Sequence, residues 1–263
     1  MQAVWASILA QARQPLPANL QGFVLGEHRL GHWPLEHALN MSEVIPMRCV
    51  GQDWVMDDPG DNAARSHLLG VAARALHERG LIHGWRDEDY ASWGTVDQPG
   101  LPGEQEWFRL ERSMFRYMGL RSHAVHVNGF ASDGGIWRAR RALTKAVDPG
   151  LFDNLAAGGL AAGETVLTCA WRELYEEAGL GPEHIARLEP LGTVLTERME
   201  PQGWHSESLT VFNAWLKPGA QPVNQDGEVM QFDRVDWSDI LHDWRQHRWT
   251  MDAACVMALA GQS

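Results

Sequence analysis

Cysteine is scarce in this chain of 263 residues, in which only Cys49, Cys169 and Cys255 carry a thiol. The three lie far apart and form no CxxC pair, which argues against a disulfide framework and against a thiolate zinc site. We therefore expect a protein of a reducing compartment, the cytoplasm.

Long apolar runs are also missing. No stretch approaches the roughly 20 apolar residues that a membrane-spanning helix needs, so we expect no membrane partner. Residues 1–15 (MQAVWASILAQARQP) lack the basic start and long apolar stretch of a signal peptide, so we expect them to belong to the fold. A composition of 44% hydrophobic and 21% charged residues is that of an ordinary folded protein.

Basic residues are too few to balance the acidic ones. Lys and Arg number 22 against 34 Asp and Glu, which gives a formal net charge of -12. An acidic surface repels nucleic-acid phosphates at long range, so we expect no nucleic-acid partner. A small molecule remains as the expected partner. The sequence leaves a homodimer open, since no motif argues for or against it.

The first part of the chain mixes short strands and helices. Gly80 follows the longest helical stretch where a C-terminal glycine belongs, and Asp61 precedes it as a plausible N-cap. Residues 1–118 are therefore expected to form a small α+β domain. Its expected elements are strands at 23–26 and 49–56, a helix at 61–80, a loop at 94–105 and a helix at about 107–118.

From about residue 119 the pattern changes to longer alternating stretches around one central helix. This arrangement predicts an α/β domain over residues 119–263. Its expected strands are 123–130, 135–143, 188–198, 205–216 and 228–237, and its expected helices are 165–178, about 238–246 and about 251–260.

The central helix carries clustered acidic residues. Residues 165–178 contain no Gly or Pro, and Gly179 follows where a helix ends. At 100° per residue, Glu173, Glu176 and Glu177 share an arc of about 100°. Two carboxylates 4 Å apart repel by roughly 1 kcal/mol in water and about 4 kcal/mol at an effective dielectric of 20. A hard divalent cation would reverse that repulsion, although an acidic stripe alone is more often a solvated helix face.

The spacing around the helix is more specific than the acidic stripe. The segment GGLAAGETVLTCAWRELYEEAGL at 158–180 fits GX5EX7REUXEEXGU, where U is aliphatic. A chance match in a chain of this length is on the order of 10⁻⁷ to 10⁻⁶ at average residue frequencies. This pattern is the Nudix box, and the chain resembles the Nudix hydrolase family. The fixed positions are filled by Gly158, Glu164, Arg172, Glu173, Leu174, Glu176, Glu177, Gly179 and Leu180.

The resemblance implies an α/β/α sandwich with a mixed sheet, preceded here by the small α+β domain. It implies Mg²⁺, with Mn²⁺ as an alternative, as the cofactor for cleaving a diphosphate linkage. Glu176 and Glu177 would be the main metal ligands, and Glu173 would be a further ligand or the base that activates water. Glu164 and Arg172 would form an ion pair that orients the helix. Gly158 and Gly159 lie in the preceding loop, where a backbone carbonyl often completes the metal site of this family.

Weaker signals outside the box indicate further metal ligands and substrate-binding residues. Glu228, just before a late strand, is the candidate for an additional metal ligand that this family often uses, and Glu207 is a weaker one. A basic stretch upstream of the box offers a place for substrate phosphate, because Arg suits bidentate contacts. The expected substrate-binding residues are Arg138, Arg140, Lys145 and Asn154.

Segments 123–130, 137–164 and 226–232 resemble a Nudix subfamily related to thiamine pyrophosphokinases, whose members carry an additional N-terminal domain. That resemblance implies hydrolysis of thiamine diphosphate, or of its oxidised forms, to the monophosphate. Alternatives left open are a hydrolase of 8-oxo-dGDP or ADP-ribose and a non-catalytic Nudix-fold binding module. An isopentenyl diphosphate isomerase of related fold would need an active-site cysteine, which the sequence does not identify.

Overall fold

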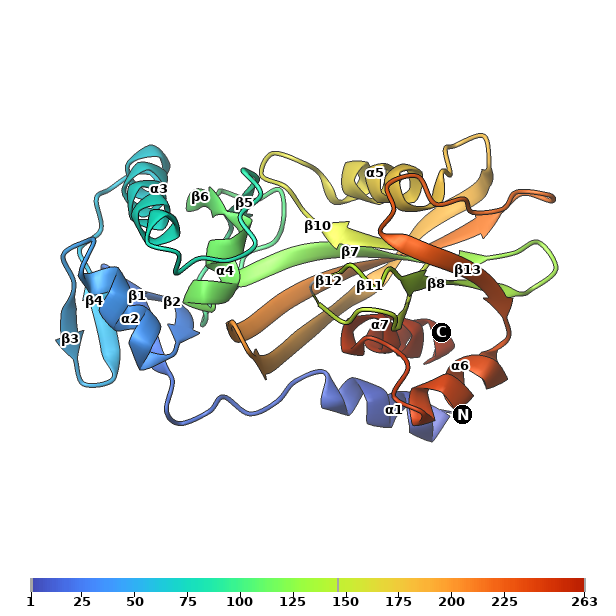
Figure 1. Cartoon of the computed structure of the whole chain (residues 1–263), viewed down its shortest axis with the longest axis horizontal. Helices are drawn as coiled ribbons and strands as arrows, with labels where there is room; N and C mark the ends of the chain where they lie inside the picture. Colours follow the sequence, from blue (N-terminus) through green and yellow to red (C-terminus); the bar gives the residue numbers. More distant parts are fainter. Residues whose placement is uncertain (1, 146, 263) are drawn as a thin grey trace.

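The computed structural model describes residues 2–145 and 147–262, and its C-terminal half is built on a mixed sheet (Figure 1). The strands are β7 (Arg121–Phe130), β8 (Ile136–Arg141), β9 (Phe152–Asp153), β10 (Ala156–Gly159), β11 (Ile185–Glu200), β12 (Gly203–Leu216) and β13 (Val229–Val235). They are ordered β11-β12-β7-β8-β13, with β10 added to β7 and β9 to β8. β12 runs parallel to β7, whereas β10 and β11 pair antiparallel with their neighbours.

Helices cover both faces of this sheet. Figure 1 shows α5 (Val166–Ala178) on one side and α1 (Gln2–Gln11), α6 (Trp237–Arg245) and α7 (Met251–Gln262) on the other. The alternation of β7 explains the two layers, because Val125 packs in the core under α5 and Ala124 in the core under α7. The expected α/β/α sandwich with a mixed sheet is confirmed.

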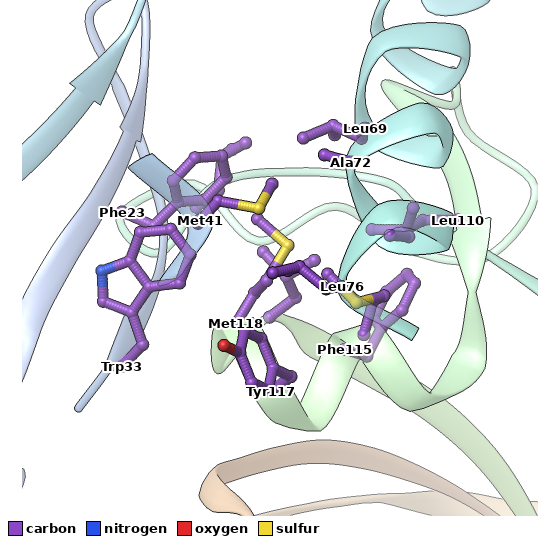
Figure 2. Packing of buried hydrophobic residues seen from close by; sticks show 14 of the residues in the cluster. Phe23, Trp33, Met41, Leu69, Ala72, Leu76, Leu110, Phe115, Tyr117 and Met118 are labelled. Atoms are coloured by element: carbon purple, nitrogen blue, oxygen red, sulfur yellow. The ribbon is translucent and has the colours of Figure 1, made fainter. Parts of the chain in front are cut away.

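The remaining elements gather around a core of their own, which Figure 2 shows. They are β1 (Gln21–Leu25), β2 (His28–Trp33), α2 (Leu35–Ser42), β3 (Arg48–Val50), β4 (Asp53–Met56), α3 (Asn62–Glu78), β5 (Asp89–Ser92), β6 (Phe108–Glu111) and α4 (Arg112–Met118). The strands β2-β1-β4-β3 form one sheet, and β5 and β6 form a hairpin. Phe23 and Trp33 from the sheet face Leu69 and Leu76 of α3 across this core.

Two expectations about this part were wrong. Residues 49–56 are not one strand, because Gly51 takes a left-handed conformation with φ 65° and turns β3 back onto β4. The helix expected from about residue 107 begins only at Arg112, because residues 108–111 pair with β5. A tight turn reverses the chain at the first place, and pairing with β5 outweighs local propensity at the second.

The N-terminal segment joins the two halves. Trp5 and Ile8 of α1 are buried in the core beneath α7, far along the chain. The following residues extend the edge of β11, since Gln14 N–H donates to the Glu197 carbonyl at 2.7 Å. We propose that the chain divides into two domains near residue 118. Helix α1 nevertheless packs against α7 of the second domain. None of the helices described is long and apolar enough to cross a membrane.

Candidate active site on helix α5

Helix α5 begins and ends where the sequence predicts. Thr165 is its N-cap and accepts a hydrogen bond from Thr168 N–H at 3.1 Å, and Gly179 ends it with φ 64°. Residues such as Ala170 and Leu174 are fully buried against the sheet, which fixes the rotation of the helix. The side chains of Glu173 and Glu177 are consequently buried as well, while Glu176 is half exposed at the rim.

Gly158 provides the seat for Glu173. A Cβ added at Gly158 would overlap the carboxyl group of Glu173. β10 and α5 can therefore approach closely only because residue 158 lacks a side chain. Burial raises the pKa of Glu173, and the charge of Arg172 opposes that rise.

Glu177 is held by the backbone of the same loop. Its carboxylate accepts a hydrogen bond from Ala157 N–H at 2.9 Å. Burial, followed by the charge of Asp153, raises the pKa of Glu177 well above its ordinary value. Two carboxylates beside each other in a buried site make this a place where a cation would be stabilised.

Arg172 connects the acidic residues to one another. It forms the ion pair expected with Glu164, at 2.9 Å from Nε to Oε1 and 3.0 Å from Nη2 to Oε2. Its Nη1 also donates to Glu173 at 2.6 Å and to Glu176 at 3.1 Å. The guanidinium thus neutralises the rim of the acidic stripe, while a bond to the Gly159 carbonyl at 3.1 Å ties it to the loop.

Two basic residues lie near Glu177, Arg141 at the end of β8 and Lys145 in the loop that follows. Lys145 forms an ion pair with Glu228, and its charge also favours ionisation of Glu177. Burial opposes ionisation of Glu228, but the hydrogen bond from Lys145, together with the charges of Lys145, Arg86 and Arg141, lowers the pKa of Glu228. Arg141 donates to Asp153 at 2.7 Å. The expected residues Lys145 and Glu228 therefore lie together near Glu177.

Other expected substrate residues lie in different surroundings. Arg138 forms ion pairs with Asp243 on α6 and with Asp233 on β13. Arg140 donates to the Gly150 carbonyl at 3.2 Å, and both Arg138 and Arg140 lie over the Phe152 ring.

Asn154 is almost completely buried. Its side-chain oxygen bonds His126 Nδ1 at 2.7 Å, and its amide nitrogen donates to Asn128 at 2.9 Å. These bonds join the turn after β9 to β7, which gives Asn154 a structural task in this fold. A free diphosphate group would have to displace one of them to reach this amide.

A different cluster has the geometry of a metal site. Within the part of the chain that is described, ligand atoms of His205, Glu207 and Asp252 lie within 4.8 Å of one another. Asp252, however, already accepts two hydrogen bonds from Arg198, at 2.7 and 3.0 Å, and Glu207 accepts one from Ser122 at 2.7 Å. The carboxylates of this cluster therefore already have partners, Arg198 for Asp252 and Ser122 for Glu207, and we interpret the cluster as a buried network of ion pairs and hydrogen bonds.

Two residues near the box, Asp153 and Tyr90, are not predicted from the sequence. The charge of Asp153 raises the pKa of Glu177, although no sequence motif around Asp153 indicates a site residue. Tyr90 comes from the β5–β6 hairpin, and a Cβ at Gly159 would overlap its hydroxyl group. Through Tyr90, the N-terminal elements contact the box loop directly. No spacing rule links these segments, which only the fold brings together.

The geometry of loop, helix and ion pair agrees with a comparison to known families, in which the NUDIX domain matches residues 120–255. The chain belongs to the Nudix family. The matched range begins directly after α4 and ends in α7, so it covers the sandwich except α1 and the second half of α7.

Two curated Nudix proteins of Arabidopsis thaliana are similar to the chain. Nudix hydrolase 24, chloroplastic, is 27% identical over 210 residues, which is 79% of this chain and 55% of that protein. Nudix hydrolase 20, chloroplastic, is 30% identical over 171 residues, which is 64% of this chain and 44% of that protein. The chain thus spans about half the length of these relatives. The first match is longer than the Nudix domain and includes part of the N-terminal elements.

Among solved structures, the chain resembles DR0079 from Deinococcus radiodurans. The TM-score is 0.46 and the identity 18%, and the alignment covers 62% of this chain and 92% of that one.

Proposed function

We propose that this chain is a divalent-metal-dependent hydrolase that cleaves a diphosphate linkage with residues of α5. The observation that carries the proposal is the seat of the Glu173 carboxyl group in the space left by Gly158, beside the buried Glu177. A solvated acidic helix face would leave these carboxylates exposed. Here Glu173 and Glu177 are buried although burial disfavours their charged forms, which is typical of a functional site.

The residues present fit a hard divalent cation. Glu173, Glu176 and Glu177 would hold it, with the Gly158 carbonyl and Glu228 as further oxygen ligands. Bound there, Mg²⁺ or Mn²⁺ would neutralise diphosphate oxygens and lower the pKa of a coordinated water. Arg172 bridges Glu173 and Glu176, so we expect a bound cation to displace these two contacts and leave the pair with Glu164 intact.

The chain's own groups would then divide the work of hydrolysis. The Ala157 N–H orients Glu177, and the Arg172–Glu164 pair fixes the loop against the helix. Glu173 takes a proton from the attacking water as the new P–O bond forms. The bridging P–O bond breaks, and the leaving phosphate carries away its electron pair. Lys145 binds a substrate phosphate, while Arg138, Arg140 and Asn154 support the strand and loop that carry it.

For the substrate we propose thiamine diphosphate or its oxidised forms, hydrolysed to the monophosphate. This assignment rests on the resemblance of segments 123–130, 137–164 and 226–232 to the thiamine-related subfamily. Its support is that all three segments border α5, since β7 and β10 contact the helix and Phe232 packs against the core that contains Leu174. The net charge of -12 further favours a small molecule over a nucleic acid.

The isomerase alternative lacks a suitable thiol. Cys169 lies within α5 and is fully buried, and burial raises the pKa of its thiol. Cys255 is buried in α7, and burial likewise raises the pKa of its thiol. Cys49 is exposed, but it lies on β3 in the N-terminal sheet. Free thiols also suit the reducing cytoplasm that we propose as the location.

The test is a substrate panel with purified protein and Mg²⁺. It contains thiamine diphosphate, its oxidised forms, 8-oxo-dGDP and ADP-ribose, and follows monophosphate and phosphate release. Turnover confined to the thiamine compounds is expected. Turnover of nucleotides alone would keep the hydrolase and reject the thiamine substrate, and no turnover of any compound would favour a binding module.

A further inference from the structure

A cavity of about 310 Å³ lies between the two halves of the chain, away from the box. Its lining comes from β7, β11 and β12, from the loop after β5, and from the segment Arg13–Leu16 that crosses to the N-terminal sheet. The volume is at the lower end of those of small-molecule sites. It is large enough for one aromatic ring with a short substituent.

Aromatic and apolar side chains form much of the wall. Trp93 and Trp204 are both buried and line the cavity together with Leu30 and Val96. Two indole rings in one small cavity provide flat apolar surface for a planar ligand. This part of the site therefore favours a ring.

The charged residues of the wall are unbalanced. Arg13 and Arg121 share a single carboxylate, that of Glu197, at 2.7 Å and 3.3 Å respectively. Arg121 also donates to Ser206 at 3.3 Å. Two guanidinium groups against one carboxylate leave one positive charge uncompensated among the described wall residues, which favours a ligand with one oxyanion.

His123 gives an independent sign of a missing ligand. It lines the cavity with only 5% of its surface exposed, and its Nδ1 is buried without a hydrogen-bond partner among the described residues. With the ring proton on Nδ1, that N–H has no acceptor among the described residues, and leaving it unpaired costs free energy. The ring packs edge-to-face with Trp93, with centroids 4.9 Å apart. His123 can thus donate a hydrogen bond to a ligand beside the Trp93 ring.

The cavity is separate from the acidic stripe of α5. No glutamate of the box lines it, and the wall residues of β7 are Arg121 and His123. The backbone nevertheless links the two places, because the His123 carbonyl accepts from Leu160 N–H at 2.9 Å, directly after the box glycines.

We propose that this cavity is a binding site for a small planar aromatic molecule with one oxyanion, held by Arg13, Arg121 and His123 between the two tryptophans. A carboxylate and a phosphate monoester present the same chemistry to the guanidinium groups. Occupation is independent of a divalent metal, which distinguishes this site from the diphosphate site on α5.

Calorimetric titration of the full chain with phenyl phosphate and with benzoate, in EDTA, tests the proposal. Benzyl alcohol serves as the uncharged probe. We expect one equivalent of at least one anionic probe to bind, and the better probe identifies the oxyanion. Arg121→Met should weaken that binding at least tenfold and Arg13→Met at least fivefold. Arg187→Met is the matched control, since Arg187, like Arg13 and Arg121, pairs with a single carboxylate, that of Glu189, but lies outside the cavity.

Histidine NMR signals of the unmodified chain supply a second measurement, which does not depend on the folding of the arginine variants. The His123 ring signal, assigned by its loss in His123→Gln, should shift on addition of the anionic probe. Absence of saturable binding, equal binding of benzyl alcohol, or unchanged affinity in both arginine variants would overturn the proposal. A requirement for Mg²⁺ would also overturn it, because the probe would then occupy the diphosphate site.

Discussion

The carboxyl group of Glu173 fills the space that a side chain at Gly158 would occupy. This contact joins the loop and the helix of the box into one unit, because a shift of either one would separate Glu173 from Gly158. The pair therefore offers the first test of whether this packing serves catalysis.

Gly158→Ala should displace Glu173 and lower kcat/KM for the diphosphate substrate by about 10²-fold, because small errors in position are costly in catalysis. Overpacking should also cost about 1–3 kcal/mol of unfolding free energy. Gly70→Ala is the control, since Gly70 lies in α3 with nothing within 4 Å of an added Cβ. Steady-state kinetics and denaturant unfolding give both numbers. Retention of more than half the activity by Gly158→Ala would contradict this role.

Arg172→Lys should weaken the structure of the box. A lysine ammonium cannot reproduce the two parallel bonds to Glu164, so we expect a loss of about 1–3 kcal/mol in unfolding free energy and a lower kcat. Arg187→Lys keeps a positive charge beside Glu189 and the Trp215 ring at an exposed position, so it should cost less than about 0.5 kcal/mol. Equal effects of the two substitutions would show that the pair with Glu164 contributes nothing particular.

Contact between the N-terminal elements and the box can be measured as a coupling energy. Gly159→Ala should be destabilising because the new methyl group meets the Tyr90 hydroxyl group. In a Tyr90→Leu background the same substitution should cost at least about 1 kcal/mol less. Urea unfolding of the four proteins of this cycle gives the coupling. Additive effects would mean that Tyr90 does not contact the loop in solution.

Stability should fall in mild acid because of buried His205. Burial lowers the pKa of His205 to about 4, against an ordinary value of 6.5. Between these values the unfolded chain binds the proton more tightly, so stability is present above pH 6.5 and is lost as the pH falls towards 4. From pH 7 to pH 5 this one group should cost on the order of 2 kcal/mol.

The comparison of variants isolates this effect from the carboxylates of the box, whose raised pKa values act in the opposite direction. His205→Asn should reduce the loss of unfolding free energy between pH 7 and pH 5 by about 2 kcal/mol. His83→Asn, at an exposed position, should leave it unchanged. An identical pH dependence in all three proteins would refute the assignment to His205.

Much of the C-terminal sandwich could be predicted from the sequence. Alternation marks β7 and β12 clearly, and Thr165 and Gly179 delimit α5 through local capping rules. The ion pair of Arg172 with Glu164 followed from the family pattern, although the spacing alone leaves the two residues about two turns apart. Local signals were therefore sufficient for the box.

The rest depends on contacts between distant segments, which periodicity does not encode. Tyr90 reaches Gly159 only because the β5–β6 hairpin packs beside β10, and α1 lies against α7 at the other end of the chain. The sequence predicts substrate contacts for Arg138, because Arg suits phosphate binding, and for Asn154. The structure gives them partners in Asp243 and His126 that no sequence pattern predicted.

Turnover by Glu177→Gln is the most direct test of the proposed active site. Glutamine keeps an oxygen to accept the Ala157 N–H but removes the charge that a cation requires. With Mg²⁺ and the diphosphate panel, we expect turnover by the unmodified chain and by Glu189→Gln, an exposed control on β11, and a loss of at least about 10²-fold in Glu177→Gln. Equal turnover by Glu177→Gln and the unmodified chain would contradict the assignment of the active site to α5.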